Sequence, residues 1–461
     1  GFCYLIFLSY ICILNINKMY KAVVTKLKNV RPHPNADKVQ LATCHGNQVV
    51  IGLDSLEDHW GVYFPCDGQL SHEFCHANNL YRDKTKNKFP DEKAGMFDDN
   101  RRVRAQRFRG EISDGFWVPL HHFGFIHVYG LDVEGLELDE WGGVPICNKY
   151  INPNTLKAAQ QNQGKKTRVA KTSVMFKEHI DTEHFGKNVH QIKDGDLIII
   201  TEKLHGTSHR VGHVLVERDL NWFEGLLKRF GVKIEEYGWA YLNGTRRVVL
   251  EEAKTDATQF HDPTIRDKAF NLFKDNLRKG ETVYLEIVGY EAENKPIMPS
   301  VDTTKMGDKE FTQKYSNLGD KKGMVYSYGC ESNKQDFYVY RMTMTNADGQ
   351  SVDYAWDDVV KRCNEIGVKH VPEITRFRRA ELMAKNEKLT DDRTFGENIT
   401  ELVDIYSKGS STIDNTHIRE GVCVRLESGL VPRIYKHKSF EFKVLEGFAK
   451  DSGVVDMEES S

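Results

Sequence analysis

Lys203 lies at the end of the run DLIIITEK, which is mainly apolar, and is followed closely by His205, Gly206, Thr207 and Ser208. A lysine at the end of a buried strand is desolvated, and neighbouring cations would further favour its neutral form. A neutral amine is a nucleophile, the glycine lets a ligand approach the backbone, and the hydroxyls can form hydrogen bonds. The same segment would also suit a surface lysine before a turn, so it does not decide between the two interpretations.

Four later segments place further polar residues on predicted strands. VYLEIVGY puts Glu286 on an apolar strand, where an unpaired carboxylate is costly and should meet a ligand, a metal or a cation. DFYVYRM offers an aromatic face, including Tyr340, on which a base could stack. REGVCVRLE places Glu420 where a carboxylate would suit magnesium or manganese. YKHKSFEFK puts Lys436 and Lys438 two residues apart, hence on one face of a strand.

Each of these features alone has a plainer interpretation as core aromatics, structural ion pairs or a solvated basic edge. Their order along the chain is harder to explain by accident. A lysine nucleophile, a metal, two further lysines and an aromatic ring are the parts of a nucleotidyl-transfer site. In such a site the amine attacks the α-phosphorus, and cations neutralise the charge that develops on the phosphate.

With these residues the sequence resembles the covalent nucleotidyltransferases, which include polynucleotide ligases and capping enzymes. Lys203-Leu204-His205-Gly206 matches the first motif of that superfamily, and His205 stands where DNA ligases and capping enzymes usually carry Asp. This departure is similar to the RNA ligase 2 group and favours RNA ends. FKEHIDTEHF, EKLHGTS and NGTRRVVL narrow the resemblance to the Deinococcus-type and Naegleria-type RNA ligases. It covers about residues 19–448.

The resemblance implies a three-step ligation that uses ATP and Mn²⁺ or Mg²⁺, the family often preferring manganese. Lys203 would become lysyl-AMP, the AMP would pass to a 5′-phosphate, and a 3′-hydroxyl would displace it. The implied substrate is a nicked duplex with RNA on the 3′-hydroxyl side, and the implied role is RNA repair. The implied site residues are Lys203 and His205 for catalysis, Glu202, Gly206, Arg246 (or Arg247), Glu286, Tyr340, Lys436 and Lys438 for the nucleotide, Glu420 and Glu286 for the metal, and Arg425 for the substrate strand.

The strand pattern suggests two domains. From Met19 to about Cys147, short runs such as KAVVTKL, VQLATC, QVVIGL, GVYFP and GFWVPL predict a small β-barrel. After residue 176, strands alternate with helices predicted at 355–366 and 376–387, which indicates an α+β domain. The resemblance implies that the barrel is an OB fold and that the second domain is a nucleotidyltransferase domain of the ATP-grasp-like ligase adenylylation type. We expect the OB-fold β-barrel over 19–150, a linker over 151–175, the nucleotidyltransferase domain over 176–449, and an acidic tail over 450–461. RPHPNADKVQLATCHG is similar to the opening of tRNA-binding OB modules.

An arginine cluster lies in the predicted barrel. Its members are Arg101, Arg102, Arg104, Arg107 and Arg109. Such a cluster can neutralise backbone phosphates and give salt-dependent, sequence-tolerant binding of nucleic acid. A solvated, partly structural strand is the alternative. The resemblance implies that this domain docks the duplex and supports sealing more than adenylylation of the lysine.

Composition sets broader limits. The 461 residues are 39% hydrophobic and 28% charged, with a formal net charge of −3, so a polyanion must be bound by a local patch. Nine cysteines without a CxxC pair predict a reducing intracellular compartment, cytoplasmic or other. Cys66, His72, Cys75 and His76 lack the paired spacing of a zinc site, which stays a minor alternative.

The apolar run at residues 1–14 is shorter than the roughly 20 residues of a membrane span. We expect residues 1–18 to be upstream sequence that is not native, with a short anchor as the alternative. We expect the chain not to associate with membranes and to be a monomer. Two rivals remain: a capping guanylyltransferase, which usually carries its OB domain after the transferase domain, and an RNA-binding or tRNA-binding protein with an inactive transferase domain.

Overall fold

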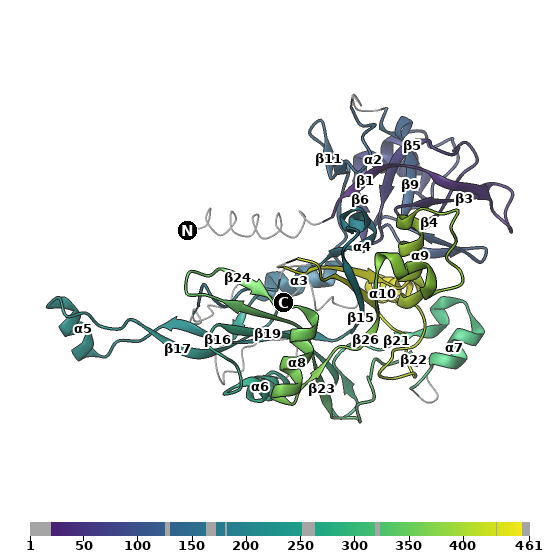
Figure 1. Ribbon diagram of the computed structural model, residues 1–461. Coiled ribbons are helices and arrows are strands. Elements are labelled where there is room, and N and C mark those ends of the chain that lie inside the picture. The colour runs from purple at the N-terminus through teal and green to yellow at the C-terminus, as the bar shows by residue number, and fades with distance from the viewer. Residues whose placement is uncertain are drawn as a thin grey trace. The chain divides into compact units, whose positions relative to one another are not determined.

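The computed structural model describes residues 20–124, 130–162, 172–179, 182–250, 263–318, 323–429 and 431–453. The proposed upstream extension over 1–18 lies outside the described residues, as do residues 163–171 of the predicted linker and residues 454–461 of the predicted tail. The chain divides into two compact units (Figure 1). Unit 1 holds residues 20–152 and 446–451, and unit 2 holds residues 153–445 with the few described residues after 451.

Unit 1 consists mainly of short antiparallel strands. The five runs predicted as strands form β1, β3, β4, β5 and β9. Two sheets run in the orders β10-β1-β5-β9 and β2-β3-β4. Val24, Val62 and Phe64 of the first sheet are fully buried in one core. Ala42 and Val49 of the second sheet are fully buried in another core. The elements are β1 (Ala22–Lys26), β2 (Lys28–Pro32), β3 (Val39–Cys44), β4 (Asn47–Gly52), β5 (Trp60–Phe64), β6 (Gly68–Leu70), α2 (His72–Ala77), β7 (Ala105–Phe108), β8 (Glu111–Asp114), β9 (Phe116–Pro119), β10 (Glu137–Leu138), β11 (Glu140–Trp141), β12 (Val144–Pro145) and β13 (Cys147–Lys149).

The end of the last helix belongs to unit 1. Helix α10 (Phe440–Asp451) continues past residue 450, where the sequence predicts an acidic tail. Its residues 446–451 contact the side chain of Arg102, which donates to the carbonyl of Gly447 at 2.7 Å and to Asp451 Oδ1 at 2.8 Å. Arg102 also donates to Asp67 Oδ1 at 2.7 Å. These charge-assisted bonds explain why the helix continues to Asp451.

Unit 2 contains two larger sheets. Their orders are β14-β28-β27-β15-β26 and β18-β17-β16-β19-β23-β24, with β20 and β25 paired to the second sheet. The strands are β14 (Glu183–His184), β15 (Leu197–Lys203), β16 (Thr207–Glu217), β17 (Tyr237–Gly244), β18 (Val249–Leu250), β19 (Glu281–Ala292), β20 (Lys295–Pro296), β21 (Val301–Asp302), β22 (Gly323–Met324), β23 (Gln335–Thr345), β24 (Ser351–Asp353), β25 (Lys369–His370), β26 (Glu373–Arg378), β27 (Gly421–Leu426) and β28 (Arg433–Lys438).

Helices cover both sheets. The helices of unit 2 are α3 (Pro153–Asn162), α4 (Phe185–Asn188), α5 (Trp222–Arg229), α6 (Pro263–Phe273), α7 (Lys309–Tyr315), α8 (Trp356–Ile366) and α9 (Phe395–Ser407). Helix α9 packs on one face of the five-stranded sheet, where Ile200, Val424 and Leu402 share a core. Helices α6 and α8 contact strands of the larger sheet. None of the helices in the described ranges is long and apolar enough to cross a membrane.

Two predicted elements differ from the structure. The predicted helix over 376–387 is instead the end of β26 followed by a 3₁₀ helix, η5 (Arg379–Lys385). Strand β26 forms there because it pairs with β15 at the edge of the sheet. The predicted linker begins with helix α3. Further 3₁₀ turns are η1 (Lys84–Lys86), η2 (Leu120–Phe123), η3 (Val189–Gln191) and η4 (Thr303–Met306).

Candidate nucleotidyl-transfer site

The turn between β15 and β16 connects the two sheets of unit 2 and directly follows Lys203, the last residue of β15. Two side chains hold the backbone of this turn. The N–H of His205 donates to the hydroxyl of Tyr328 at 2.6 Å, and the N–H of Gly206 donates to Glu286 Oε1 at 3.1 Å. Residue 206 must be glycine, because a Cβ there would lie 2.2 Å from the carbonyl oxygen of Ile287. The position of Lys203 is therefore fixed from both sides of the turn.

Glu420 is the partner of Lys203. Its Oε1 lies 2.7 Å from Lys203 Nζ and 3.6 Å from Lys438 Nζ, and its Oε2 lies 3.8 Å from His205 Nδ1. Glu420 is fully buried, whereas the Lys203 side chain keeps 19% exposure. The sequence predicts an amine favoured in its neutral form by burial and neighbouring cations. In the structure a buried carboxylate is in direct contact with the amine. This contact favours the charged amine rather than the neutral one, although the carboxylate can accept the proton when the amine reacts.

The strand register gathers the lysines on one face. Lys203 is opposite Gly421, which is opposite Lys438, and one row along the sheet Cys423 lies between Thr201 and Lys436. In an antiparallel sheet, residues directly opposite each other share a face. This face is opposite the one that packs on α9. A Cβ on Gly421 would lie 2.1 Å from the carbonyl oxygen of His437, so a residue with a side chain would not fit at this point beside β28.

Tyr340 sits at a β-bulge in β23. Tyr284 pairs with Arg341 and Leu285 pairs with Val339, so Tyr340 is the extra residue. A bulge redirects a side chain and is common beside active sites. The Tyr340 hydroxyl lies 2.8 Å from Ser208 Oγ. The side chain of Tyr340, at this bulge in β23, therefore meets Ser208 near the start of β16.

His179 is a site residue that the strand pattern does not reveal. Its ring lies 5.1 Å from the ring of Tyr340 and 5.8 Å from that of Tyr284, centroid to centroid. Its N–H donates to the carbonyl of Arg246 at 3.1 Å. Burial holds the pKa of His179 well below its usual value, and the charges of Arg246, Arg341, Lys203 and Lys436 lower it further. The segment FKEHIDTEHF, which carries part of the family resemblance, was the available signal.

Two predicted site residues have other partners. Glu202 is buried, and its Oε2 accepts from both the N–H and the hydroxyl of Thr412, with Arg419 Nε 3.6 Å away. Arg425 is 2% exposed, donates to Glu427 Oε1 at 2.8 Å and packs over the ring of Trp356. Both form internal ion pairs in the structure, and their predicted contacts with ligands stay a prediction. A charged residue can contact a ligand or form an internal ion pair, and the sequence alone does not show which of the two it does.

The five arginines of the cluster in unit 1 differ in exposure and in their partners. Arg102 and Arg104 pair with Asp451, so their guanidinium groups are occupied inside unit 1. Arg101 donates to the carbonyl of Leu70 at 2.9 Å. Arg107 and Arg109 are exposed, and each also donates to a backbone carbonyl, of Gly110 and Asn35 respectively. Of the five arginines, Arg107 and Arg109 are therefore the exposed ones, and phosphate binding by the cluster stays a prediction.

The side chains around Lys203 could supply only some of the ligands of a metal ion. Within the described ranges, no group of three or more His, Cys, Asp or Glu residues could hold an ion. However, Glu420 Oε2 is buried and has no hydrogen-bond partner among those residues. Mg²⁺ is commonly bound by one or two carboxylates together with substrate phosphates and waters. The residues present thus fit a metal whose coordination is completed by a phosphate-bearing substrate.

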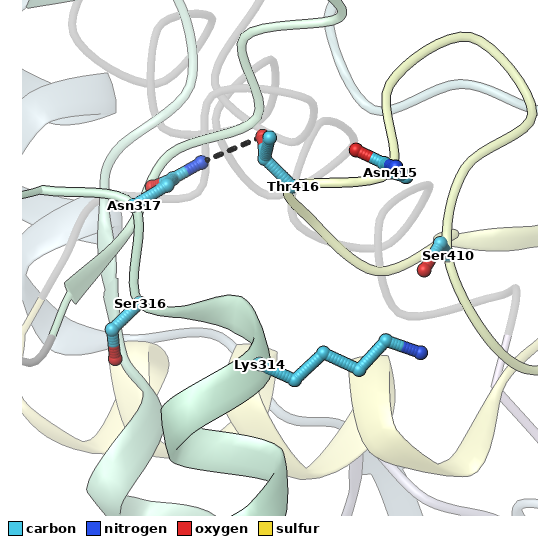
Figure 2. A pocket seen from close by; sticks show the side chains of 6 residues that line it. All are labelled: Lys314, Ser316, Asn317, Ser410, Asn415 and Thr416. Carbon is cyan, nitrogen blue, oxygen red and sulfur yellow. Dashed lines mark hydrogen bonds between the residues drawn. The ribbon is translucent and has the colours of Figure 1, made fainter.

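A polar hollow of about 510 Å³ lies elsewhere in unit 2. It lies between helix α7 and the loop that precedes β27, and Figure 2 shows the six side chains around it. Asn317 Nδ2 donates to Thr416 Oγ1 across one edge at 3.2 Å. None of the residues gathered around Lys203 lines this hollow, so it is separate from the candidate nucleotidyl-transfer site. Its lining residues are Lys314, Ser316, Asn317, Ser410, Asn415 and Thr416.

Comparisons with known proteins agree with this geometry. A family model described as RNA ligase matches residues 196–445, and another described as an OB-fold domain matches residues 21–120. The chain is similar to an apo mutant of Naegleria gruberi RNA ligase, with a TM-score of 0.54 and 18% identity over 93% of this chain and 98% of that chain. A mutant of the same ligase with ATP and Mn gives a TM-score of 0.54 and 16% identity over 92% and 98%. No curated protein matches the chain.

Proposed function

Because the chain belongs to the RNA ligase family, we propose that it is an ATP-dependent RNA ligase in which Lys203 carries the adenylate. The observation that carries this proposal is the contact between Lys203 Nζ and Glu420 Oε1 at 2.7 Å, on the same sheet face as Lys436 and Lys438. A structural ion pair alone would not need two further lysines beside it. A triphosphate would, because its charge must be neutralised.

The first step forms a bond between Lys203 Nζ and the α-phosphorus of ATP and breaks the bond to pyrophosphate. The amine must lose a proton, and Glu420 Oε1 is positioned to accept it. Lys436 and Lys438 would stabilise the negative charge on the α-phosphate. The adenylate then moves to a 5′-phosphate, and a 3′-hydroxyl displaces AMP to form the phosphodiester.

Other side chains would orient the nucleotide. Tyr340, held by Ser208 and backed by the ring of His179, offers an aromatic surface for adenine. Arg246 lies near His179, where its charge could reach a phosphate. His205, with Nδ1 3.8 Å from Glu420 Oε2, would assist the end-joining steps. Glu286 holds the backbone of Gly206 and would act on the ligand mainly by keeping this turn in place.

A divalent cation would be held by Glu420 together with the phosphates of ATP. When bound, it would neutralise phosphate charge and support the departure of pyrophosphate. The relative of this chain from Naegleria gruberi has been solved with ATP and Mn, which supports manganese as one candidate beside magnesium.

The proposed substrate is a nick in a duplex with RNA on the 3′-hydroxyl side. Support comes from the OB-fold match and from exposed Arg107 and Arg109, which can contact backbone phosphates without reading sequence. Matched nicked duplexes that differ only in ribose or deoxyribose at the terminal 3′-hydroxyl nucleotides test this. We expect sealing to depend on the ribose; equal sealing of both would contradict the proposed specificity.

The reaction itself is tested by incubation with α-labelled ATP or GTP and metal. We expect label from ATP on the wild-type chain and on Lys193→Ala, an exposed control, and none on Lys203→Ala. Lys203→Ala should still seal a pre-adenylylated nick in part, which distinguishes loss of the nucleophile from loss of the fold. Label from GTP would favour the capping enzyme, and no label would favour a binding protein.

A further inference from the structure

Tyr328 lies in a tight turn whose backbone conformation is unusual for a tyrosine. The N–H of Cys330 donates to the carbonyl of Ser327 at 3.0 Å and closes the turn. The two central residues, Tyr328 and Gly329, have φ values of 50° and 73°. Positive φ at both positions is the pattern of a type I′ turn, which glycine and asparagine favour. A bulky residue is strained there and persists only where its surroundings impose the conformation.

The strained residue contacts the candidate site. The side chain of Tyr328 is buried, and its hydroxyl accepts the N–H of His205, two residues after Lys203. A glycine in place of Tyr328 would relieve the strain but would offer no hydroxyl to this N–H. Strained backbone of this kind clusters at functional sites, where the surrounding structure holds it. The contacts that hold the turn are therefore part of what positions Lys203.

Asp414 holds the turn on both sides of Tyr328. It lies in the loop between α9 and β27 and is 9% exposed. Its Oδ2 accepts from the hydroxyl of Ser327 at 2.5 Å and from the N–H of Gly329 at 2.9 Å, and its Oδ1 accepts from the N–H of Thr416 at 2.9 Å. Burial raises the pKa of Asp414, but the hydrogen bonds outweigh burial and lower the pKa to about 2. Asp414 is thus a carboxylate at neutral pH.

The same loop contacts Tyr328 a second time. The N–H of Tyr328 donates to His417 Nε2 at 3.3 Å. His417 Nδ1 lies 2.9 Å from the carbonyl oxygen of Ile418, so Nδ1 carries the proton and Nε2 can accept. The loop then leads to Glu420, the partner of Lys203. One loop therefore carries Glu420 and also holds, through Tyr328, the turn that follows Lys203.

These contacts link both sides of the Lys203–Glu420 pair to one buried carboxylate. We propose that Asp414 is a positioning residue for the adenylylation of Lys203 and that it acts through Tyr328. It does not contact the nucleotide. Its hydrogen bonds keep the phenol of Tyr328 against the N–H of His205, and so keep Lys203 Nζ beside Glu420 Oε1. The proposal rests on the proposed ligase reaction.

Asp414→Asn tests this role. The amide has one oxygen and a donor group in place of the second oxygen, so at least one of the three hydrogen bonds is lost. We expect the rate of lysyl-AMP formation at saturating ATP, per folded molecule, to fall by about 10–100-fold, because a displacement of about 1 Å can cost about 10²-fold. The apparent KM for ATP should change little, because Asp414 does not contact the nucleotide.

Asp196→Asn is the matched control. Asp196 is 1% exposed, accepts from the N–H of Lys193 and pairs with Arg433 Nη2 at 2.9 Å, at the opposite end of β15 from Lys203. Its loss should lower stability, as the loss of a buried carboxylate partner does, without lowering the rate per folded molecule. An Asp414→Asn variant that behaves like this control, losing stability but no rate, would overturn the proposal.

A double-mutant cycle shows whether Asp414 acts through Tyr328. Tyr328→Phe removes the hydroxyl and should slow lysyl-AMP formation on its own. The double variant should then be no slower than Tyr328→Phe, because the contact that Asp414 supports is already absent. Independent effects would instead multiply in the rate, since their free energies add. Multiplied losses would overturn the route through Tyr328.

Amide hydrogen exchange over residues 203–208 gives a measure that needs no activity. We expect faster exchange in Asp414→Asn and in Tyr328→Phe, and wild-type exchange in Asp196→Asn, because only the first two loosen the turn locally. A wild-type chain that takes no label from ATP would contradict the proposed function, and exchange would still decide whether Asp414 holds the turn. Unchanged exchange in Asp414→Asn would overturn the proposal whatever the activity.

Discussion

Glu202 and Lys203 are neighbours in the chain, but their side chains leave β15 on opposite faces. Lys203 contacts Glu420 on the face that carries Lys436 and Lys438, while Glu202 accepts hydrogen bonds from Thr412 in the loop before β27. Alternation along a strand requires this separation. We therefore expect the two residues to have different roles, Lys203 in the proposed chemistry and Glu202 in holding the loop that leads to Glu420.

Glu202→Ala should reduce stability more than catalysis. It leaves Arg419 without the buried carboxylate 3.6 Å from its Nε, and removing one partner of a buried ion pair costs about 3–5 kcal/mol. We expect lower resistance to urea, with adenylylation per folded molecule retained within about threefold under conditions that keep the variant folded. Denaturation curves and labelling with ATP measure the two effects. A large loss of adenylylation in fully folded protein would show that Glu202 contacts the nucleotide after all.

Glu420→Gln should have the opposite effect. The amide keeps the shape of the side chain but neither accepts the proton of Lys203 nor binds a cation strongly. General-base groups contribute about 10²–10⁴-fold, so we expect a loss of that order in the rate of lysyl-AMP formation. Rapid-quench labelling with ATP measures this rate. Wild-type rates in this variant would mean that the proton leaves by another route.

The arginines of unit 1 should separate into two groups. Arg107→Ala together with Arg109→Ala should weaken binding of the nicked duplex and reduce the slope of log affinity against log salt by about two, while adenylylation is spared. Arg102→Ala should instead destabilise unit 1, because it removes a buried guanidinium that pairs with Asp67 and Asp451 and leaves these carboxylates only Lys450 and the partly exposed Arg104. Binding titrations at several salt concentrations and thermal melts distinguish these outcomes. An unchanged salt slope in the double variant would remove this surface from the RNA interface.

The sequence predicts the position of the chemistry better than the partners of its charges. The sequence alone placed Lys203 at the end of a strand and Lys438 on the same strand face as Lys436, because strand ends and the alternation of side chains are local properties. The ion pairs of Arg102 with Asp451, and of Glu202 with Arg419, join residues more than 200 positions apart, so a local pattern cannot reveal them. Tyr340 was identified as an aromatic strand residue, but its bulge depends on the register with β19. The segment 376–387 was misassigned because its strand is defined by pairing with β15.

His209 should make folding stability depend on pH. It is fully buried on β16, and Arg266 Nη1 lies 3.2 Å from its Nδ1, so this nitrogen is an acceptor and the ring is neutral. Burial, followed by the charges of Arg266 and Arg210, holds its pKa well below the usual value. Below about pH 6.5 the unfolded chain therefore binds a proton that the folded chain does not. Stability is complete above that pH and falls as pH decreases.

His209→Gln tests this directly, because an amide oxygen can still accept from Arg266 but cannot titrate. Between about pH 4.5 and 6.5, one proton corresponds to a slope of about 1.4 kcal/mol per pH unit in the free energy of unfolding. We expect the variant to lose up to this amount of slope relative to the wild type, measured by urea denaturation at several pH values. Other buried histidines, such as His179, titrate in both proteins and cancel in the difference. Identical slopes would mean that His209 is already protonated in the folded chain or shielded in the unfolded one.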